Sequence, residues 1–195
     1  MWRFPQVLEG RYVRLEPLSL AHLPGFLEAY DPEVYRFLSR APQEATPEAL
    51  RAHLEGLLTE PGRVNWAIYR EDTLAGRISV IAPEPENAKL ELGTMVFKPF
   101  WGSPVNKEAK YLLLRHAFEV LRVERIQFKV DLRNARSQRA LESLGAVREG
   151  VLRKNRRLPD GTFRDDVIYG LLREEWPPVK ARLEARLYGG DPGRP

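Results

Sequence analysis

The sequence predicts an α+β fold with one mixed, mostly antiparallel sheet and helices packed against it. Three strand-like runs, at 64–70, 74–82 and 89–97, follow one another with only short turns between them, which is typical of an antiparallel meander. The run 106–121 places apolar side chains on a broad helical face, and such a helix needs a sheet to pack on. A Pro-Asp-Gly turn between two later strand-like runs indicates a further hairpin.

The N-terminal third is expected to contribute one strand and three helices. Residues 11–16 alternate between polar and apolar side chains, which favours a half-buried strand. Ser19 is a good N-cap for a helix to about residue 30. The Asp-Pro and Thr-Pro pairs at 31–32 and 46–47 are typical helix starts, and they predict helices to about residues 38 and 58. These helices should cover one side of the structure.

The second half is expected to alternate strands and helices. Asn134 is a favourable N-cap and Gly145 a favourable residue just past a helix C-terminus, so we predict a helix between them. The other predicted elements are a strand at 125–131, hairpin strands at 146–157 and 163–172, and a basic amphipathic helix from Trp176 to Tyr188. We predict a single domain over residues 1–188 and a flexible C-terminal tail at 189–195.

Composition excludes several classes of protein. The chain has 195 residues and no cysteine, so disulfides, thiolate metal sites and a cysteine nucleophile are absent. No apolar run approaches the roughly 20 residues that span a bilayer, and residues 1–5 lack the apolar core of a signal peptide. We therefore expect a soluble, cytoplasmic protein with no membrane partner.

The net charge of +4 is divided unevenly along the chain. Residues 1–97 carry 10 Lys+Arg against 14 Asp+Glu, a net charge of −4, whereas residues 98–195 carry 21 against 13, a net charge of +8. A basic half can serve an anionic cofactor, a nucleic acid or only a solvated surface. The acidic half is suited to attracting a cationic amine.

One loop in the basic half has the form of an anion site. The stretch from Met95 to Gly145 reads as strand, turn, helix, strand and helix, and its first turn runs into the N-terminus of the long helix. Unpaired backbone N–H groups and the positive end of the helix dipole can hold a pyrophosphate there. An ordinary connection between a strand and a helix fits the spacing equally well.

A series of short motifs occurs in order between residues 8 and 178. They are Glu91-Leu92-Gly93, Trp101-Gly102, Glu108-Ala109, His116-Ala117-Phe118-Glu119, Arg133-Asn134-Ala135-Arg136-Ser137, Leu144-Gly145-Ala146, Arg148-Glu149-Gly150-Val151-Leu152-Arg153, Asp160-Gly161, Arg164-Asp165 and Glu175-Trp176. This ordered set resembles the GNAT acetyltransferase superfamily, and within it the RimJ/RimL group of ribosomal-protein N-terminal acetyltransferases. The resemblance implies a sheet splayed open between its fourth and fifth strands, with helices on both faces and acetyl-CoA in the cleft.

The resemblance also implies three groups of cofactor contacts. Backbone groups of the fourth strand would meet the pantetheine arm, the 102–107 loop would face the pyrophosphate, and the helix after the fifth strand would meet the pantetheine and the sulfur. The residues so implied are Met95, Val96, Phe97, Gly102, Ser103, Val105, Asn106, Lys107, Asn134 and Ser137. Asn134 could combine this contact with capping its helix, because a carboxamide both donates and accepts.

The loop departs from the pattern of the family it resembles. Pro104 stands where the second glycine is usual, and Asn106 replaces a small residue. Proline has no N–H to offer a phosphate. Lys107 and the Ser103 hydroxyl could substitute for the missing donor. Alternatively, the Asn106 side chain could cap the helix and compete for the same N–H groups.

The implied chemistry is direct attack of a primary amine on the acetyl thioester. We assign Glu91 as the base, directly or through water, a backbone N–H near Val96 or Phe97 as the oxyanion donor, and Ser137 as the acid for the departing thiolate. The alternatives are a solvent-facing or ion-paired Glu91, and a Ser137 that only bonds its own helix backbone. No metal is assigned, because His22, His53 and His116 are scattered without metal-ligand spacing.

The acceptor is expected to be an amine substrate, with the N-terminus of a ribosomal protein or peptide as the first candidate. Amino acids, polyamines and aminoglycosides fit equally well, because a fold does not determine its substrate. RNA contact through the basic half is a secondary hypothesis, and a non-catalytic relic that binds CoA or RNA is another. The chain could be a monomer or a homodimer, since Trp2, Phe4, Trp176 and Tyr188 could cover an interface or the core of the domain itself.

Overall fold

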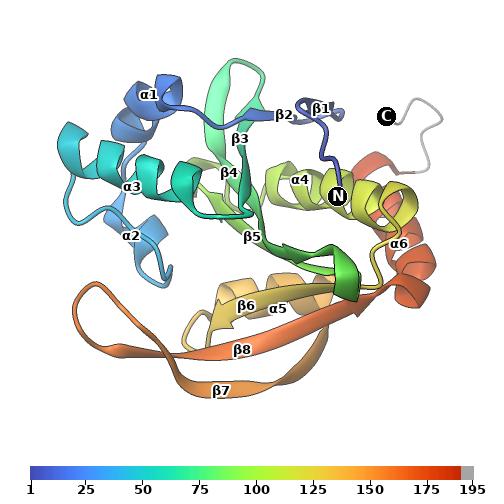
Figure 1. Ribbon diagram of the computed structural model, residues 1–195. Coiled ribbons are helices and arrows are strands. Elements are labelled where there is room, and N and C mark those ends of the chain that lie inside the picture. The colour runs from blue at the N-terminus through green and yellow to red at the C-terminus, as the bar shows by residue number, and fades with distance from the viewer. Residues whose placement is uncertain (190–195) are drawn as a thin grey trace.

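In the computed structural model, which describes residues 1–189, eight strands form one mixed sheet with helices on both faces (Figure 1). Across the sheet the order is β1-β2-β3-β4-β5-β6-β8-β7. The strands are β1 (Leu8–Glu9), β2 (Arg14–Pro17), β3 (Val64–Arg70), β4 (Thr73–Glu84), β5 (Lys89–Val96), β6 (Arg125–Asp131), β7 (Val147–Arg157) and β8 (Phe163–Leu172). The predicted α+β class and the mostly antiparallel sheet are confirmed. The predicted tail, apart from Gly189, lies outside the described residues.

One pair of neighbouring strands, β5 and β6, is parallel and is joined only briefly. The register pairs Lys89–Glu91 with Arg125–Gln127. Since β5 continues to Val96 and β6 to Asp131, the second halves of these strands have no ladder between them, and they diverge (Figure 1). The predicted splay between the two strands is therefore confirmed.

The helices α1 (Leu23–Glu28), α2 (Pro32–Tyr35) and α3 (Pro47–Thr59) pack on one face of the sheet. Ser19 caps as predicted, but it opens a 3₁₀ turn at Leu20–His22 rather than a continuous helix. The helix predicted to reach residue 38 ends at Tyr35. The chain turns away there, and the Phe37 carbonyl accepts a hydrogen bond from the Arg164 guanidinium of β8 at 2.9 Å.

The opposite face carries α4 (Val105–Arg115), α5 (Ala135–Leu144) and α6 (Trp176–Tyr188). The long predicted helix changes character near its end, because His116–Val120 forms a π-helical turn in which the Leu121 amide bonds the His116 carbonyl. The caps of α5 are as predicted: Asn134 Oδ1 accepts from the Ser137 amide at 3.1 Å, and Gly145 takes a left-handed φ of 105°.

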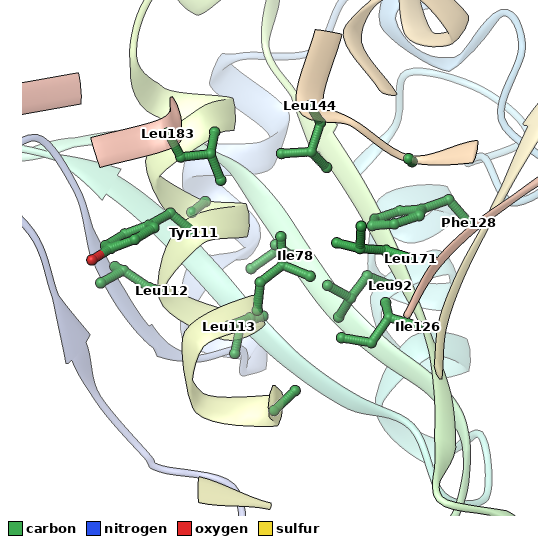
Figure 2. Packing of buried hydrophobic residues seen from close by; sticks show 14 of the residues in the cluster. Ile78, Leu92, Tyr111, Leu112, Leu113, Ile126, Phe128, Leu144, Leu171 and Leu183 are labelled. Carbon is green, nitrogen blue, oxygen red and sulfur yellow. The ribbon is translucent and has the colours of Figure 1, made fainter. Parts of the chain in front are cut away.

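The main core lies between the sheet and α4, α5 and α6. Figure 2 shows Ile78 and Leu92 of the sheet facing Leu112 and Leu113 of α4, with further side chains around them. The aromatic side chains near both chain ends belong to this core: Trp176 and Tyr188 are buried, and Trp2 and Phe4 pack against it. A second core lies under α1 to α3. Within residues 1–189, no helix has both the length and the apolar character that crossing a bilayer requires.

Candidate active site

Where β5 and β6 part, a cavity of about 120 Å³ opens between the strands; we call it the first cavity. Its walls come from residues 92–96 of β5, residues 128–131 of β6, the first two turns of α4 and the start of α5. Two strands that would otherwise pair leave their backbone groups facing this space. A buried backbone group without a partner is costly, so such a gap suits a ligand with amide groups of its own.

Half of the predicted cofactor residues line the first cavity and half do not. Those that line it are Met95, Val96, Asn106, Asn134 and Ser137. Those that do not are Phe97, Gly102, Ser103, Val105 and Lys107. The second group lies in the loop before α4, in the first turn of that helix and just after the end of β5. These residues are close in sequence to residues that line the cavity.

Backbone hydrogen bonds distinguish Val96 from Phe97 as an oxyanion donor. The Phe97 amide donates to the Ala75 carbonyl of β4 at 2.8 Å, so it is already occupied. Successive N–H groups of a strand point to opposite edges, and Val96 therefore faces the open side, toward β6. The Val96 carbonyl on that side accepts from Trp101 Nε1 at 2.8 Å. Val96 is the better of the two predicted donors.

The loop before α4 resolves the question of which residue caps the helix. Asn106 is the second residue of α4, and its side chain makes no cap bond. Its Oδ1 is buried and has no hydrogen-bond partner among residues 1–189. The Ser103 hydroxyl accepts from the Val105 amide at 3.3 Å instead. The alternative of an Asn106 cap is therefore wrong, because the helix begins one residue earlier, at Val105. Asn106 lines the first cavity instead.

Two further residues of the first cavity were not anticipated from the sequence. Lys110 lies one turn after Asn106 on α4, and burial followed by the nearby Arg136 lowers the pKa of its ammonium to about 8. The Arg136 guanidinium stacks over the Trp101 ring at 3.6 Å from its centroid. Lys110 could have been found by its spacing, since it follows Asn106 by four residues and so shares its helix face. Arg136 carries no such signal, because neighbouring residues of a helix point in different directions.

Glu91 lies in a second cavity, also of about 120 Å³, which shares residues 92–94, Leu38, Lys129 and Arg164 with the first. Its carboxylate is mostly buried and pairs with the Lys129 ammonium at 3.3 Å, and it accepts from Gln127 Nε2 at 3.4 Å. Ser137 lines only the first cavity. The two predicted catalytic residues therefore stand in adjoining spaces on either side of the β5 residues that both cavities share.

The second cavity is rich in arginine. Glu60 pairs with Arg40 at 3.1 Å and with Arg63 at 2.8 Å. Burial tends to raise the pKa of Glu60, but the Arg63 hydrogen bond and the surrounding guanidinium charges outweigh it, so the pKa is lowered. Arg77 is 5% exposed, and burial together with Arg63 lowers its pKa to about 10. At this pKa the Arg77 guanidinium remains charged at neutral pH.

The three histidines lie in different environments. His22 accepts a hydrogen bond from the Ser19 amide and lies 2.9 Å from the Glu16 carboxylate. His116 lies 3.2 Å from the Arg3 carbonyl. Burial, and then the charge of Arg77, lowers the pKa of His53 to about 3. In the part of the chain that the structure describes, no three His, Cys, Asp or Glu side chains group as metal ligands would.

Comparison with known proteins identifies the family. Residues 13–147 match the model of the acetyltransferase (GNAT) domain. The chain belongs to the GNAT acetyltransferase family. It is an N-acetyltransferase, and this family uses acetyl-CoA.

Individual relatives agree with this family assignment. A solved structure from T. thermophilus, named "putative acetyltransferase", is 82% identical, with a TM-score of 0.95 over 96% of this chain and 100% of that one. A GCN5-related N-acetyltransferase from Brucella melitensis is 27% identical, with a TM-score of 0.86 over 94% and 87%. The protein named "Putative ribosomal N-acetyltransferase YdaF" of Bacillus subtilis (strain 168) is 31% identical over 54% of this chain and 57% of its own length.

Proposed function

We propose that this GNAT protein binds acetyl-CoA in the first cavity and transfers the acetyl group to a primary amine held in the second. The observation that carries the proposal is the junction of the two cavities. They meet at residues 92–94 of β5, where the sheet opens, so a thioester in one space can face an amine in the other. Glu91 and Ser137 stand on opposite sides of that junction.

The first cavity provides polar groups for the amides of a pantetheine arm. Asn134 uses its side-chain oxygen for the cap of α5, which leaves its NH₂ group free to donate. Asn106 offers a buried oxygen acceptor without a partner among residues 1–189. The amides of Asn106 and Lys107, in the first turn of α4, have no intrahelical acceptor, and they point toward the position we assign to the pyrophosphate. Gly102, Ser103 and Val105 would shape this loop.

The reaction we propose has no covalent enzyme intermediate. Glu91 removes a proton from the acceptor ammonium, directly or through water, and the free amine attacks the thioester carbon. The resulting oxyanion accepts from the Val96 amide. When the C–S bond breaks, the Ser137 hydroxyl donates its proton to the thiolate, and it is reprotonated, directly or through water, by the proton that the attacking nitrogen loses as the amide forms. The side chains of Met95 and Phe97, which belong to the core under α1 to α3, would hold the strand in position.

For the acceptor we propose the N-terminal amine of a protein or peptide, with a ribosomal protein as the first candidate. This rests on the RimJ/RimL resemblance and on the printed name of YdaF. A small amine such as an amino acid is the second candidate. RNA contact and oligomeric state do not enter this proposal.

Calorimetry with acetyl-CoA and an assay of free CoA release test the proposal. We expect binding, and turnover with at least one member of a panel of amines and N-terminal peptides. Absence of binding at millimolar acetyl-CoA would overturn the transferase proposal, and binding without turnover on any amine would favour a non-catalytic CoA-binding protein.

The catalytic roles are tested by kinetics at saturating acetyl-CoA. Glu91→Gln should lower kcat by roughly 10²-fold or more, as loss of a general base does. Ser137→Ala should lower kcat less, and Asn134→Ala should raise the KM for acetyl-CoA. Glu71→Gln, in the exposed β3–β4 turn, is the matched control. An unchanged kcat in Glu91→Gln at every pH would remove Glu91 from the mechanism.

A further inference from the structure

The second cavity has more cationic than anionic side chains in its wall. The cations are Arg40, Arg63, Arg77, Lys129, Arg156 and Arg164, and the anions are Glu60 and Glu91. This is the opposite of what an acceptor that carries only positive charge would need. A wall of one charge sign concentrates ligands of the other sign.

Most of these cations already have partners. Glu60 takes two of them, Arg40 and Arg63, and Glu91 pairs with Lys129. The guanidinium of Arg164 pairs with Asp166, which is fully buried beneath it, and also donates to the Phe37 carbonyl. Two cations remain, Arg77 and Arg156, and neither forms an ion pair within residues 1–189.

Arg77 is the decisive residue because its buried charge forms no ion pair among residues 1–189, and the carboxylate of Glu60 acts on it only from a distance. Its side chain projects from the middle of β4, is 5% exposed, and has an Nε without a hydrogen-bond partner among residues 1–189. The groups whose charges reach it include Tyr35 and His53, and both are neutral: burial raises the pKa of Tyr35 to about 12 and lowers that of His53 to about 3. A buried cation in such surroundings is unfavourable until an anion joins it.

Arg156 brings a second free guanidinium from a different part of the chain. It lies near the end of β7, is half-buried, and lowers the pKa of Glu60 although it makes no direct pair with it. β4 and β7 belong to the two halves of the splayed sheet, so the two guanidinium groups line the cavity from separate sides.

We propose that the second cavity recognises a carboxylate on the acceptor, so that the substrate is an amine with an acidic group within a few bonds of the nitrogen. The planar, multi-donor guanidinium of Arg77 matches a carboxylate, and Glu91 in the same wall matches the ammonium. Because Arg77 and Glu91 line the same cavity, the two groups of the acceptor that they recognise lie close together. The acidic group can belong to a free amino acid or to the first residues of a peptide. This inference rests on the proposed function, because it places the acceptor in this cavity.

Matched acceptors test the proposal directly. At saturating acetyl-CoA, acetylation is measured on C-terminally amidated peptides that carry Asp or Asn at residue one, two or three. A second arm compares free aspartic acid with its diamide. We expect kcat/KM to be at least about tenfold higher for the carboxylate member of at least one pair, since a site built for a charged group discriminates against its neutral analogue. A preference among the peptides would show that the carboxylate belongs to a peptide, and a preference for free aspartic acid over its diamide would show that it belongs to a free amino acid.

Variants connect the preference to the two arginines. Arg77→Met should abolish most of the carboxylate preference while leaving the KM for acetyl-CoA unchanged, and Arg156→Gln should reduce it several-fold. Arg153→Gln is the matched control, because Arg153 is an exposed arginine of the same strand, β7, that does not line the second cavity. An undiminished preference in both Arg77→Met and Arg156→Gln would overturn the assignment.

Failure of this inference is distinguishable from failure of the proposed function. Equal kcat/KM for Asp and Asn acceptors would overturn the carboxylate site and leave the acetyltransferase proposal intact. If no amine is acetylated, calorimetry of N-acetyl-aspartyl amide against N-acetyl-asparaginyl amide, with CoA present, still decides. Tighter binding of the aspartyl compound would support the site, and equal or absent binding would overturn it.

Discussion

Glu108 and Arg77 are both buried charged side chains, but their surroundings are opposite. Glu108, on α4, is completely buried and accepts four hydrogen bonds, from the amides of Arg11, Tyr12 and Val13 and from the Tyr188 hydroxyl, at 2.7 to 3.1 Å. The Arg77 side chain, on β4, has an Nε with no partner among residues 1–189. The first charge is satisfied by the protein, and the second is not.

The difference separates a structural charge from one that is available to a ligand. Glu108 joins the N-terminal segment to α4 and, through Tyr188, to the end of α6, three parts of the chain that are distant in sequence. Burial and the Glu108 hydrogen bond raise the pKa of the Tyr188 hydroxyl, so this donor stays protonated. The Arg77 side chain forms no ion pair with any residue that the structure describes. Removal of a charge that holds the fold together should lower the free energy of unfolding. Removal of a charge that is available to a ligand should weaken ligand binding.

The largest expected effect on stability comes from the replacement of Glu108. Glu108→Ala removes the acceptor of four hydrogen bonds and leaves buried donors unpaired, so we expect a loss of about 3–5 kcal/mol in the free energy of unfolding. Urea denaturation measures it, with the exposed neighbour Lys107→Ala as control. A loss below about 1 kcal/mol would show that the N-terminal segment is held by other contacts.

An intermediate effect should come from His53, which stays neutral in the folded protein while acid protonates it in the unfolded chain. The folded pKa of His53, about 3, lies below its ordinary value of 6.5 because of burial and the nearby Arg77. The unfolded chain therefore binds the extra proton between these pH values, and stability falls as the pH falls from about 6.5 toward about 3. We expect a loss of about 1–2 kcal/mol between pH 6.5 and pH 5 that His53→Gln abolishes. An unchanged pH dependence in the variant would contradict this.

The smallest expected effect on stability belongs to Arg77 itself. Arg77→Met removes a buried charge that forms no ion pair among residues 1–189, so the free energy of unfolding should stay within about 1 kcal/mol of the original or increase. Equilibrium denaturation of both proteins at one pH gives the answer. A loss above about 2 kcal/mol would mean that Arg77 is satisfied within the fold after all, and the comparison with Glu108 would fail.

Much of the fold followed from local signals. A strand-like run bounded by short turns located β3 at 64–70, and the caps at Asn134 and Gly145 located α5, because in both cases the structure depends on residues close together in the chain. The π-helical turn at His116–Val120 carries no such signal, since its wider turn is fixed by tertiary packing. The same holds for the early end of α2, which follows from the contact between Phe37 and Arg164.

The second cavity could not have been predicted from the sequence. Its six cations come from loops and strands spread between residues 40 and 164, and three of them lie in the half of the chain whose net charge is negative. The expectation that an acidic half would attract a cationic amine rested on the net charge of residues 1–97. The fold places the basic and the acidic residues of this half in different environments. Arg40, Arg63 and Arg77 face the cavity, whereas acidic residues such as Glu48 and Glu71 are exposed.

Trp101 has a consequence for experiment. Of the four tryptophans, Trp66 and Trp176 are buried in the main core and Trp2 packs against it, so Trp101 alone lines the first cavity, held by Val96 and stacked by Arg136. Any molecule that enters the cavity changes the surroundings of this indole. The protein thus contains its own fluorescent reporter, which can follow cofactor arrival in real time in the unlabelled protein.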